Sequence, residues 1–219
     1  MKTHVAWLTI LCLVLATAPV LAQVLYDDGP INGTTDAWTI NFGYIVSDTF
    51  ILLNNSTATG FNFGAWEFPG DVLTSVQWSI TSKSINGGTV YGSGTASGSN
   101  LNDKFLSQNE FGFDIDLITV SNLNVAEISG TQYWLTLANA MIPSGDPVYW
   151  DENSGIGCKG DNGMGGGCPS GAAFGFEPIP PEAFDITGTS GGTTPEPSSI
   201  VLFASGVLGV AGLKRRKLF

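Results

Sequence analysis

The chain has 219 residues, of which 43% are hydrophobic and only 12% charged, with 29 glycines and a formal net charge of −11. This length suits one domain with its targeting signals, and the apolar share suffices for a buried core. The excess of acidic residues argues against nucleic-acid binding, because an acidic surface repels the phosphate backbone. Abundant glycine with few charged residues favours short strands and turns over helices.

Residues 1–22 have the pattern of a secretory signal peptide. Lys2 supplies a positive charge, residues 5–20 are mostly apolar, and Ala22 is a small residue at a position that signal peptidases recognise. A retained membrane helix is the alternative, because the apolar run is about 18 residues long. The polar turn at residues 26–30 favours cleavage. We therefore predict an exported protein whose mature chain begins directly after Ala22.

Residues 23–187 show the alternation of apolar and polar side chains that is typical of strands with one buried face. Short sequences rich in Gly, Asn, Ser and Pro separate the alternating runs, as turns do. This pattern predicts an all-β ectodomain, an antiparallel β-sandwich of jelly-roll type. The clearest runs are Trp38–Phe42, Val72–Ile80, Phe111–Leu117 and Tyr133–Leu137, and the turns lie at residues 54–56, 69–71, 86–88, 97–100 and 144–147.

The only histidine is His4, inside the predicted signal peptide. A mature protein without histidine cannot use Ser-His-Asp or Cys-His catalysis, and it has no histidine-ligated metal. A glycan hydrolase with two carboxylates remains compatible, and Asp114 and Asp116 are its candidate pair, about 7 Å apart on one strand face. We expect instead that this face is solvated, opposite the apolar residues of the same run. The prediction is a protein that is not an enzyme.

Aromatic rings near turns are candidates for ligand contact. Trp66 and Trp150 lie near turns, where an exposed indole could stack on a sugar ring. Trp78 and Trp134 lie within the strongest strand patterns and are assigned to the core. A carbohydrate- or calcium-binding module is therefore the alternative function.

Calcium is the only ion that the sequence suggests, and no other cofactor is predicted. Asp151, Asn153 and Asp161, with Asn162 beside the last, offer hard oxygen ligands in loops. Their spacing departs from an EF-hand loop, and no glutamate completes one. Solvated turn residues are the alternative interpretation.

Two cysteines, Cys158 and Cys168, remain after removal of the signal peptide. An even pair in an oxidising compartment predicts a structural disulfide. Closing this glycine-rich loop would remove about 3 kcal/mol of unfolded-state entropy. Metal-binding thiolates are the alternative, although neither a further cysteine nor a histidine is available to complete a zinc site.

The C-terminal part joins a linker, a short apolar segment and a basic end. Residues 188–194 are rich in Gly and Thr and predict a flexible linker. Residues 199–213 predict a transmembrane helix that is short for a bilayer core of about 30 Å, with a buried core helix as the alternative. A basic stop follows and would hold the tail on the cytoplasmic side. The extended motif before the helix is Pro195, Glu196 and Pro197, and the basic stop is Lys214, Arg215, Arg216 and Lys217.

The order of these features in residues 195–219 resembles the PEP-CTERM sorting domain. The resemblance implies recognition by a membrane-embedded exosortase, cleavage near the motif, and release to the cell surface or to the exopolysaccharide of a biofilm. Glu196 would then be a recognition residue, and the membrane would hold the chain only transiently. The segments at 133–137, 148–153 and 180–184 resemble the uncharacterised ectodomains that often precede such tails. This resemblance supports a secreted β-sandwich and transfers no activity. The predicted function is a surface or matrix protein associated with exopolysaccharide.

Overall fold

The computed structural model describes residues 22–127, 129–153, 171–173 and 175–191. The predicted signal peptide, both cysteines of the predicted disulfide, Asp161, the sorting motif, the predicted transmembrane helix and the basic stop lie outside these residues. Within the described ranges the only helix is the single 3-10 turn η1 (Gly98–Asn100). Nowhere in these ranges is there a helix long and apolar enough to cross a membrane.

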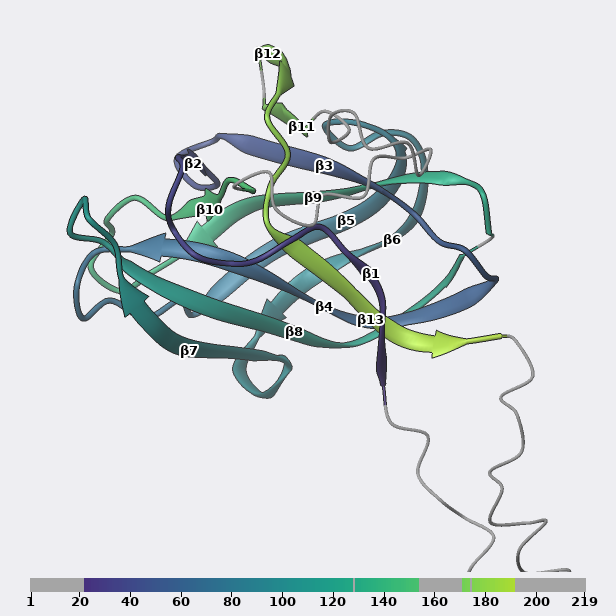
Figure 1. The fold of residues 1–219 in the computed structure, drawn as a ribbon, viewed down its shortest axis with the longest axis horizontal. Coiled ribbons are helices and arrows are strands. Elements are labelled where there is room, and N and C mark those ends of the chain that lie inside the picture. Colours follow the sequence, from purple (N-terminus) through teal and green to yellow (C-terminus); the bar gives the residue numbers. More distant parts are fainter. Residues whose placement is uncertain (1–21, 128, 154–170, 174, 192–219) are drawn as a thin grey trace, which may run out of the picture.

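Strands make up most of the described residues, as Figure 1 shows. In chain order these are β1 (Gln23–Asp27), β2 (Ala37–Thr39), β3 (Ile45–Ile51), β4 (Ser56–Glu67), β5 (Ser75–Lys83), β6 (Gly87–Ser97), β7 (Leu101–Gln108), β8 (Asp114–Glu127), β9 (Gln132–Met141), β10 (Tyr149–Asp151), β11 (Gly171–Ala173), β12 (Phe176–Ile179) and β13 (Phe184–Ser190).

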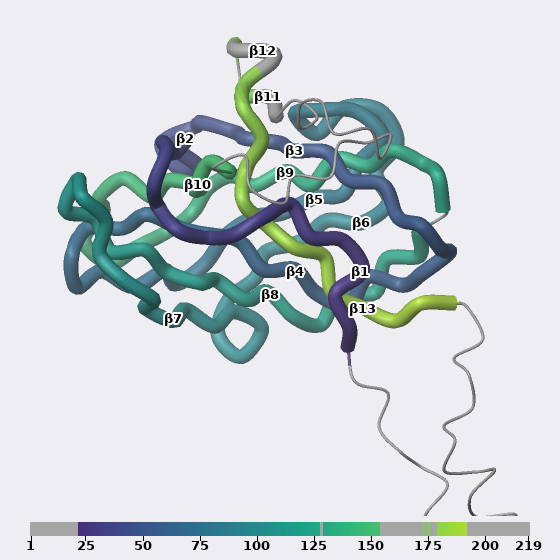
Figure 2. The backbone as a smooth tube through the Cα atoms, viewed as in Figure 1, coloured from purple at the N-terminus to yellow at the C-terminus, as the bar shows by residue number. Residues whose placement is uncertain are grey.

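The strands make two antiparallel sheets that pack face to face. In the first sheet β4 is central, and β8 and then β7 lie on one side of it. On its other side, β13 pairs with residues 56–63 of β4 and β10 pairs with residues 65–66. β1 lies next to β13, and β2 lies next to β10. The second sheet has the order β12-β11-β3-β9-β5-β6. The path of the chain between the two sheets can be followed in Figure 2. The predicted all-β antiparallel architecture is confirmed, and the jelly-roll connectivity stays a prediction.

Aromatic side chains from both sheets fill the core between them. Phe50 of β3 stacks on Tyr133 of β9, with ring centroids 5.4 Å apart. From the first sheet, Phe63 and Phe184 pack edge-on against Trp150, at 6.1 and 5.8 Å. All five rings are at most 1% exposed, so they form a buried aromatic interior between the sheets.

The alternating runs predict where the strands lie better than they predict where each strand begins and ends. In β9 the apolar positions Tyr133, Leu135 and Leu137 are all buried as predicted, although Thr136 between the last two is buried as well. The run predicted at 38–42 is shorter, since β2 ends at Thr39. Phe42 has a φ of 54° and is 63% exposed, so it belongs to a turn.

The last strand extends into the segment predicted as a linker. β13 continues to Ser190, which pairs with Ser56 of β4, so the boundary predicted at residue 188 is wrong. Glycine is required at 188, because a Cβ there would lie 2.1 Å from the carbonyl oxygen of Thr57. Gly188 also pairs with Gln23, the first residue of β1. The domain therefore begins and ends at the same place in the first sheet, as Figure 1 shows.

Candidate functional site

Both tryptophans predicted to contact a ligand are buried. Trp150 is 0% exposed, and its Nε1 donates a hydrogen bond to the carbonyl oxygen of Ala183 at 3.1 Å. Trp66 is 5% exposed and stacks on Phe111, with centroids 5.7 Å apart. The prediction of exposed ring faces is therefore wrong. It failed because proximity to a turn in the sequence does not determine exposure: β10 lies between β4 and β2.

The tryptophans assigned to the core are, by contrast, only half-buried. Trp78 packs against the core and meets Phe61 edge-on at 6.2 Å. Trp134 lies on β9 between the buried residues Tyr133 and Leu135 and is itself half-buried. The core assignment is thus correct in part for Trp78 and wrong for Trp134, since alternation turns Trp134 away from the interior.

Asp151 is a structural residue of the first sheet. It is fully buried, and its Oδ1 accepts a hydrogen bond from Trp66 Nε1 at 2.7 Å. Its Oδ2 accepts the backbone N–H groups of Asn32 and Gly33 at 3.0 and 3.2 Å. Burial raises the pKa of Asp151, and these three donors oppose that rise. Its carboxylate is thus already occupied, and the calcium site predicted at Asp151, Asn153 and Asp161 stays a prediction.

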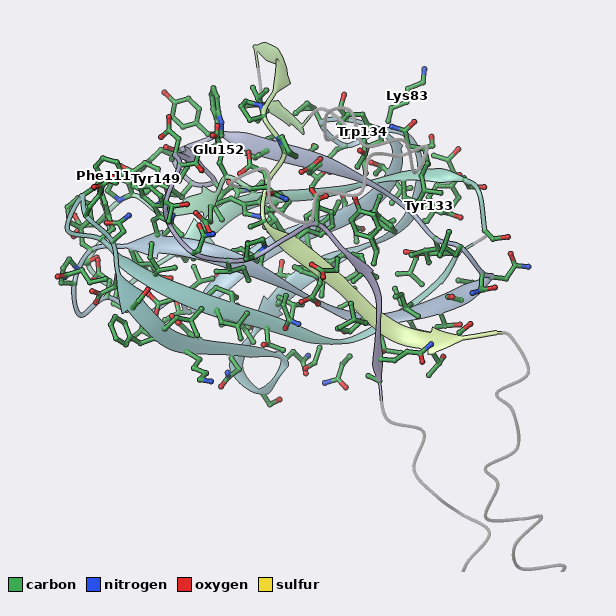
Figure 3. The ribbon with its side chains drawn as sticks, in the orientation of Figure 1. Lys83, Phe111, Tyr133, Trp134, Tyr149 and Glu152 are labelled. Atoms are coloured by element: carbon green, nitrogen blue, oxygen red, sulfur yellow. The ribbon has the colours of Figure 1, made fainter. Side chains whose placement is uncertain are left out.

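Glu182 lies in a group of buried carboxyls beside Asp151. Its side chain is fully buried, and neither carboxyl oxygen has a hydrogen-bond partner among the described residues. Burial, followed by the charges of Asp48, Glu152, Asp151 and Asp28, holds the pKa of Glu182 well above its ordinary value. Its surroundings therefore favour the neutral, protonated form of Glu182 over the charged form. Two of the neighbouring carboxylates accept hydrogen bonds. Asp48 accepts the backbone N–H of Glu182, and Glu152, which is labelled in Figure 3, accepts a hydrogen bond from Trp38 Nε1 at 2.8 Å.

A second group of carboxylates lies at the end of the sandwich where β4 finishes. Glu67 is the last residue of β4, Asp103 lies on β7, and Asp116 lies on β8. One carboxylate oxygen from each lies within 4.8 Å of the others. We call these three residues the carboxylate triad. Figure 3 labels Phe111 and Tyr149 at the same end of the molecule.

Strand pairing places the triad on the core side of the first sheet. Asp116 pairs with Ala65, a fully buried core residue, so their side chains share one face. Glu67 follows Ala65 by two residues and shares that face as well. Asp103 pairs with Ile118, another core residue. Glu67 is 0% and Asp116 4% exposed, while Asp103 is half-buried at the outer strand.

The carboxyls of the triad lie where water is scarce, which disfavours their charged forms. Burial, and then Asp103 and other nearby carboxylates, raises the pKa of Glu67 to about 8. Burial, and then Asp103 and Asp114, raises the pKa of Asp116 to about 7. Burial also raises the pKa of Asp103, although the backbone N–H of Leu73 donates to its Oδ2 at 2.7 Å. Ionising three carboxyls that lie so close together costs free energy, and a bound cation would lower that cost.

The position of Asp116 corrects the expectation of a solvated outer face for Asp114 and Asp116. The outer face at this point carries Ile115, which is fully buried. The segment before β2 covers it so closely that a Cβ on Gly33 would lie 2.4 Å from Ile115 Cδ1. Both faces of β8 are therefore covered here. Asp114 is half-buried, and its Oδ2 accepts the N–H of Gly70 at 3.1 Å.

Sequence reasoning missed Glu67 and Asp103. A signal for Glu67 was present, because it continues the alternation of Phe61, Phe63 and Ala65, all fully buried. An acidic residue on a buried face needs a partner. Nothing local marks Asp103, since its neighbour Ile118 is brought to it only by the pairing of β7 with β8.

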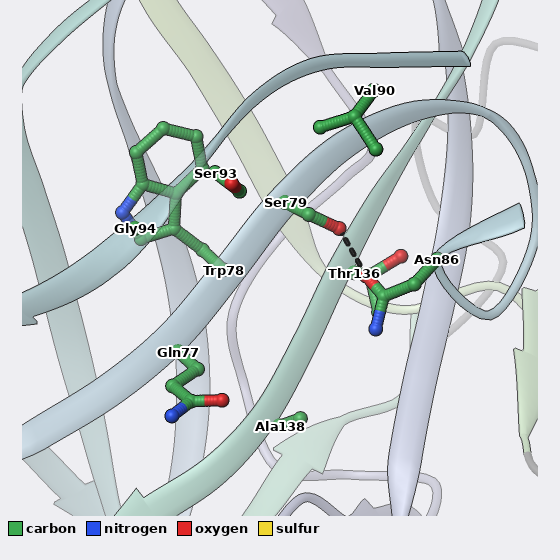
Figure 4. Close-up of a pocket in the computed structure, with 9 residues that line it drawn as sticks. All are labelled: Gln77, Trp78, Ser79, Asn86, Val90, Ser93, Gly94, Thr136 and Ala138. Atoms are coloured by element: carbon green, nitrogen blue, oxygen red, sulfur yellow. Dashed lines mark hydrogen bonds between the residues drawn. The ribbon is translucent and has the colours of Figure 1, made fainter.

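A polar hollow of about 370 Å³ lies on the second sheet and is drawn in Figure 4. Within it, Ser79 donates a hydrogen bond to Asn86, whose turn folds back over β5. Its lining contains no carboxylate. The residues that form it are Gln77, Trp78, Ser79, Asn86, Val90, Ser93, Gly94, Thr136 and Ala138.

Residues 193–217 match the family model of the PEP-CTERM protein-sorting motif. The chain carries a PEP-CTERM sorting motif. This confirms the resemblance drawn from residues 195–219, and the PEP-CTERM motif supports export and sorting through an exosortase. No curated protein matches the chain.

Proposed function

We propose that this PEP-CTERM protein is a non-enzymatic component of the cell surface or extracellular matrix, associated with exopolysaccharide after processing by an exosortase. The observation that carries the proposal is the match of residues 193–217 to the sorting motif, directly after a folded β-sandwich. The predicted signal peptide supplies export, and the tail supplies transient attachment to the membrane.

The placement of the domain ends supports this order of events. β13 ends at Ser190, so only eight residues (191–198) separate it from the start of the predicted helix at 199. Fully extended, the nine steps from residue 190 to residue 199 span about 30 Å. The domain would therefore stay close to the membrane until cleavage, with residues 195–197 within reach of a membrane-embedded protease.

The buried carboxyls support a role other than glycan hydrolysis. A glycosidase needs two carboxyl groups that face a bound sugar from opposite sides of the scissile bond. Asp116 is 4% exposed and Glu67 0% exposed, and Asp114 is engaged by Gly70. The hollow on the second sheet is lined by hydroxyl and amide side chains together with Trp78, Val90, Gly94 and Ala138, and this lining can bind a sugar but supplies no acid.

The test of the proposal is the intact mass of the protein recovered from its native host, with its cell fraction recorded. We expect a species that starts at Gln23 and ends near residues 195–197, outside the inner membrane. A Glu196→Gln variant should accumulate with residues 200–219 still attached. A wild-type chain that keeps its tail in the inner membrane would show that the tail is a plain anchor. Glu110→Gln, on the exposed surface, is the control for expression.

Direct glycan binding is the second candidate function, and the polar hollow favours it. Its lining of hydroxyl and amide groups matches the hydrogen-bonding surface of a sugar. Replacing the exposed Ser93 by tryptophan should fill the hollow and weaken binding to purified host polysaccharide at least tenfold. Binding that is saturable but unchanged in Ser93→Trp would place the glycan elsewhere, and circular dichroism would verify that the variant is folded.

A further inference from the structure

The spacing of the carboxylate triad suits one calcium ion. Calcium is bound by six to eight oxygens at about 2.3–2.6 Å, so two of its ligand atoms lie at most about 5 Å apart. The three carboxylate oxygens lie within 4.8 Å of one another. They come from three strands, so the sheet itself sets their separation. Three carboxylates can supply up to six oxygens when each binds through both.

Glu67 gives an independent indication of a ligand. Its side chain is 0% exposed and belongs to this group, yet neither Oε1 nor Oε2 has a hydrogen-bond partner among the residues that the structure describes. Buried polar groups are almost always hydrogen-bonded, and an unpartnered carboxyl is costly. Asp151, equally buried, shows the contrast, since its two oxygens accept three N–H groups.

Among the described residues, the surroundings of Glu67 add negative charge. Besides Asp103 and Asp116, the charges that act on Glu67 are those of Asp71 and Asp114. Within the described ranges only Lys83 and Lys104 are basic, and neither acts on Glu67. A divalent cation would supply the missing charge.

We propose that Glu67, Asp103 and Asp116 bind a calcium ion that fastens β4, β7 and β8 together at this end of the sandwich. All the ligands are oxygens, which suit calcium and not the softer zinc. Magnesium is disfavoured because it demands near-ideal octahedral geometry and keeps several waters. Calcium sites of extracellular modules have dissociation constants of about 10⁻⁴–10⁻³ M, a range that suits an exported chain.

The ion would also hold the loop between β4 and β5. Asp103 Oδ2 already accepts the N–H of Leu73 in this loop, and Ser144 Oγ donates to Asp71 at 2.9 Å. With its other oxygen on calcium, Asp103 would connect the loop to the ion. Calcium is thus expected to protect residues 68–74 from proteolysis and hydrogen exchange.

The experiment uses the full-length protein in mild detergent, stripped with a chelator and titrated with calcium chloride in a calorimeter. We expect one site per chain and a Tm rise of about 5–10 °C when calcium is at 100 times its Kd. Glu67→Gln and Asp116→Asn keep the shape but remove a charge, and each should weaken binding at least tenfold. Glu127→Gln is the matched control and should bind as wild type. Glu127 is also a buried glutamate whose carboxyl has no hydrogen-bond partner in the described part of the chain, but it lies at the other end of the β4–β8 pair.

Two results would overturn the proposal. The first is wild-type protein that shows neither binding heat nor a Tm rise up to 10 mM calcium. The second is a site that survives in both Glu67→Gln and Asp116→Asn, which would place the ion elsewhere. If either variant fails to fold, Asp103→Asn, at the half-buried member, gives the same comparison. Export and sorting are measured separately, so failure here leaves the proposed function unaffected.

Discussion

Replacing Trp150 by alanine is expected to lower the free energy of unfolding by about 3–5 kcal/mol, the range for a buried large aromatic residue. The indole is 0% exposed and packs between Phe63 and Phe184. Its removal leaves a cavity between the two sheets and an unpaired carbonyl at Ala183. Urea unfolding followed by circular dichroism measures the loss. Such a variant therefore reports on folding and cannot test glycan binding.

Two further variants separate packing from hydrogen bonding at this position. Trp150→Phe keeps an aromatic ring but loses the hydrogen bond to Ala183. It should lower the free energy of unfolding by about 1–2 kcal/mol more than the loss of buried apolar area alone explains. Trp134→Ala changes a half-buried residue of β9 and should lower the free energy of unfolding clearly less than Trp150→Ala does. Equal losses for the two alanine variants would contradict the assignment of Trp150 to the core and reopen its role as a surface ring.

Local patterns predicted the class of fold because strand alternation is a local property. Tyr133, Leu135 and Leu137 alternate in the sequence and are all buried. The same pattern could not show what covers each face. At Asp116 the alternation correctly separates two faces, but the face expected to meet water carries the triad, and the segment at Gly33 covers the other. Only the pairing of distant strands settles which face is inside.

The candidate site was hidden for the same reason. Glu67, Asp103 and Asp116 lie on three strands, and no spacing along the chain connects them. The sorting motif, by contrast, is contiguous in the sequence, so residues alone sufficed to recognise it before the match at 193–217. Contiguous signals can be predicted from one sequence, whereas a site assembled across strands needs their register.

Replacing Glu127 by glutamine is expected to remove a large pH-dependent loss of stability. Glu127 is 2% exposed at the end of β8, and burial raises its pKa to about 8 from 4.5. The folded state therefore keeps this proton where the unfolded state has released it. The resulting stabilisation is complete below about pH 4.5 and is lost as the pH rises towards 8.

The expected size follows from the value of about 1.4 kcal/mol for one pKa unit. Allowing for relaxation around a partly hydrated site, wild type should lose on the order of 2–4 kcal/mol more than Glu127→Gln between pH 5 and pH 8. Urea unfolding at both pH values, with chelator present, measures the difference. The control Glu110→Gln changes an exposed glutamate and should follow wild type.

Parallel pH profiles for wild type and Glu127→Gln would mean that Glu127 is hydrated in solution. In that case the sandwich would admit water at the end opposite the carboxylate triad, and β8 would be open where it pairs with Ser56.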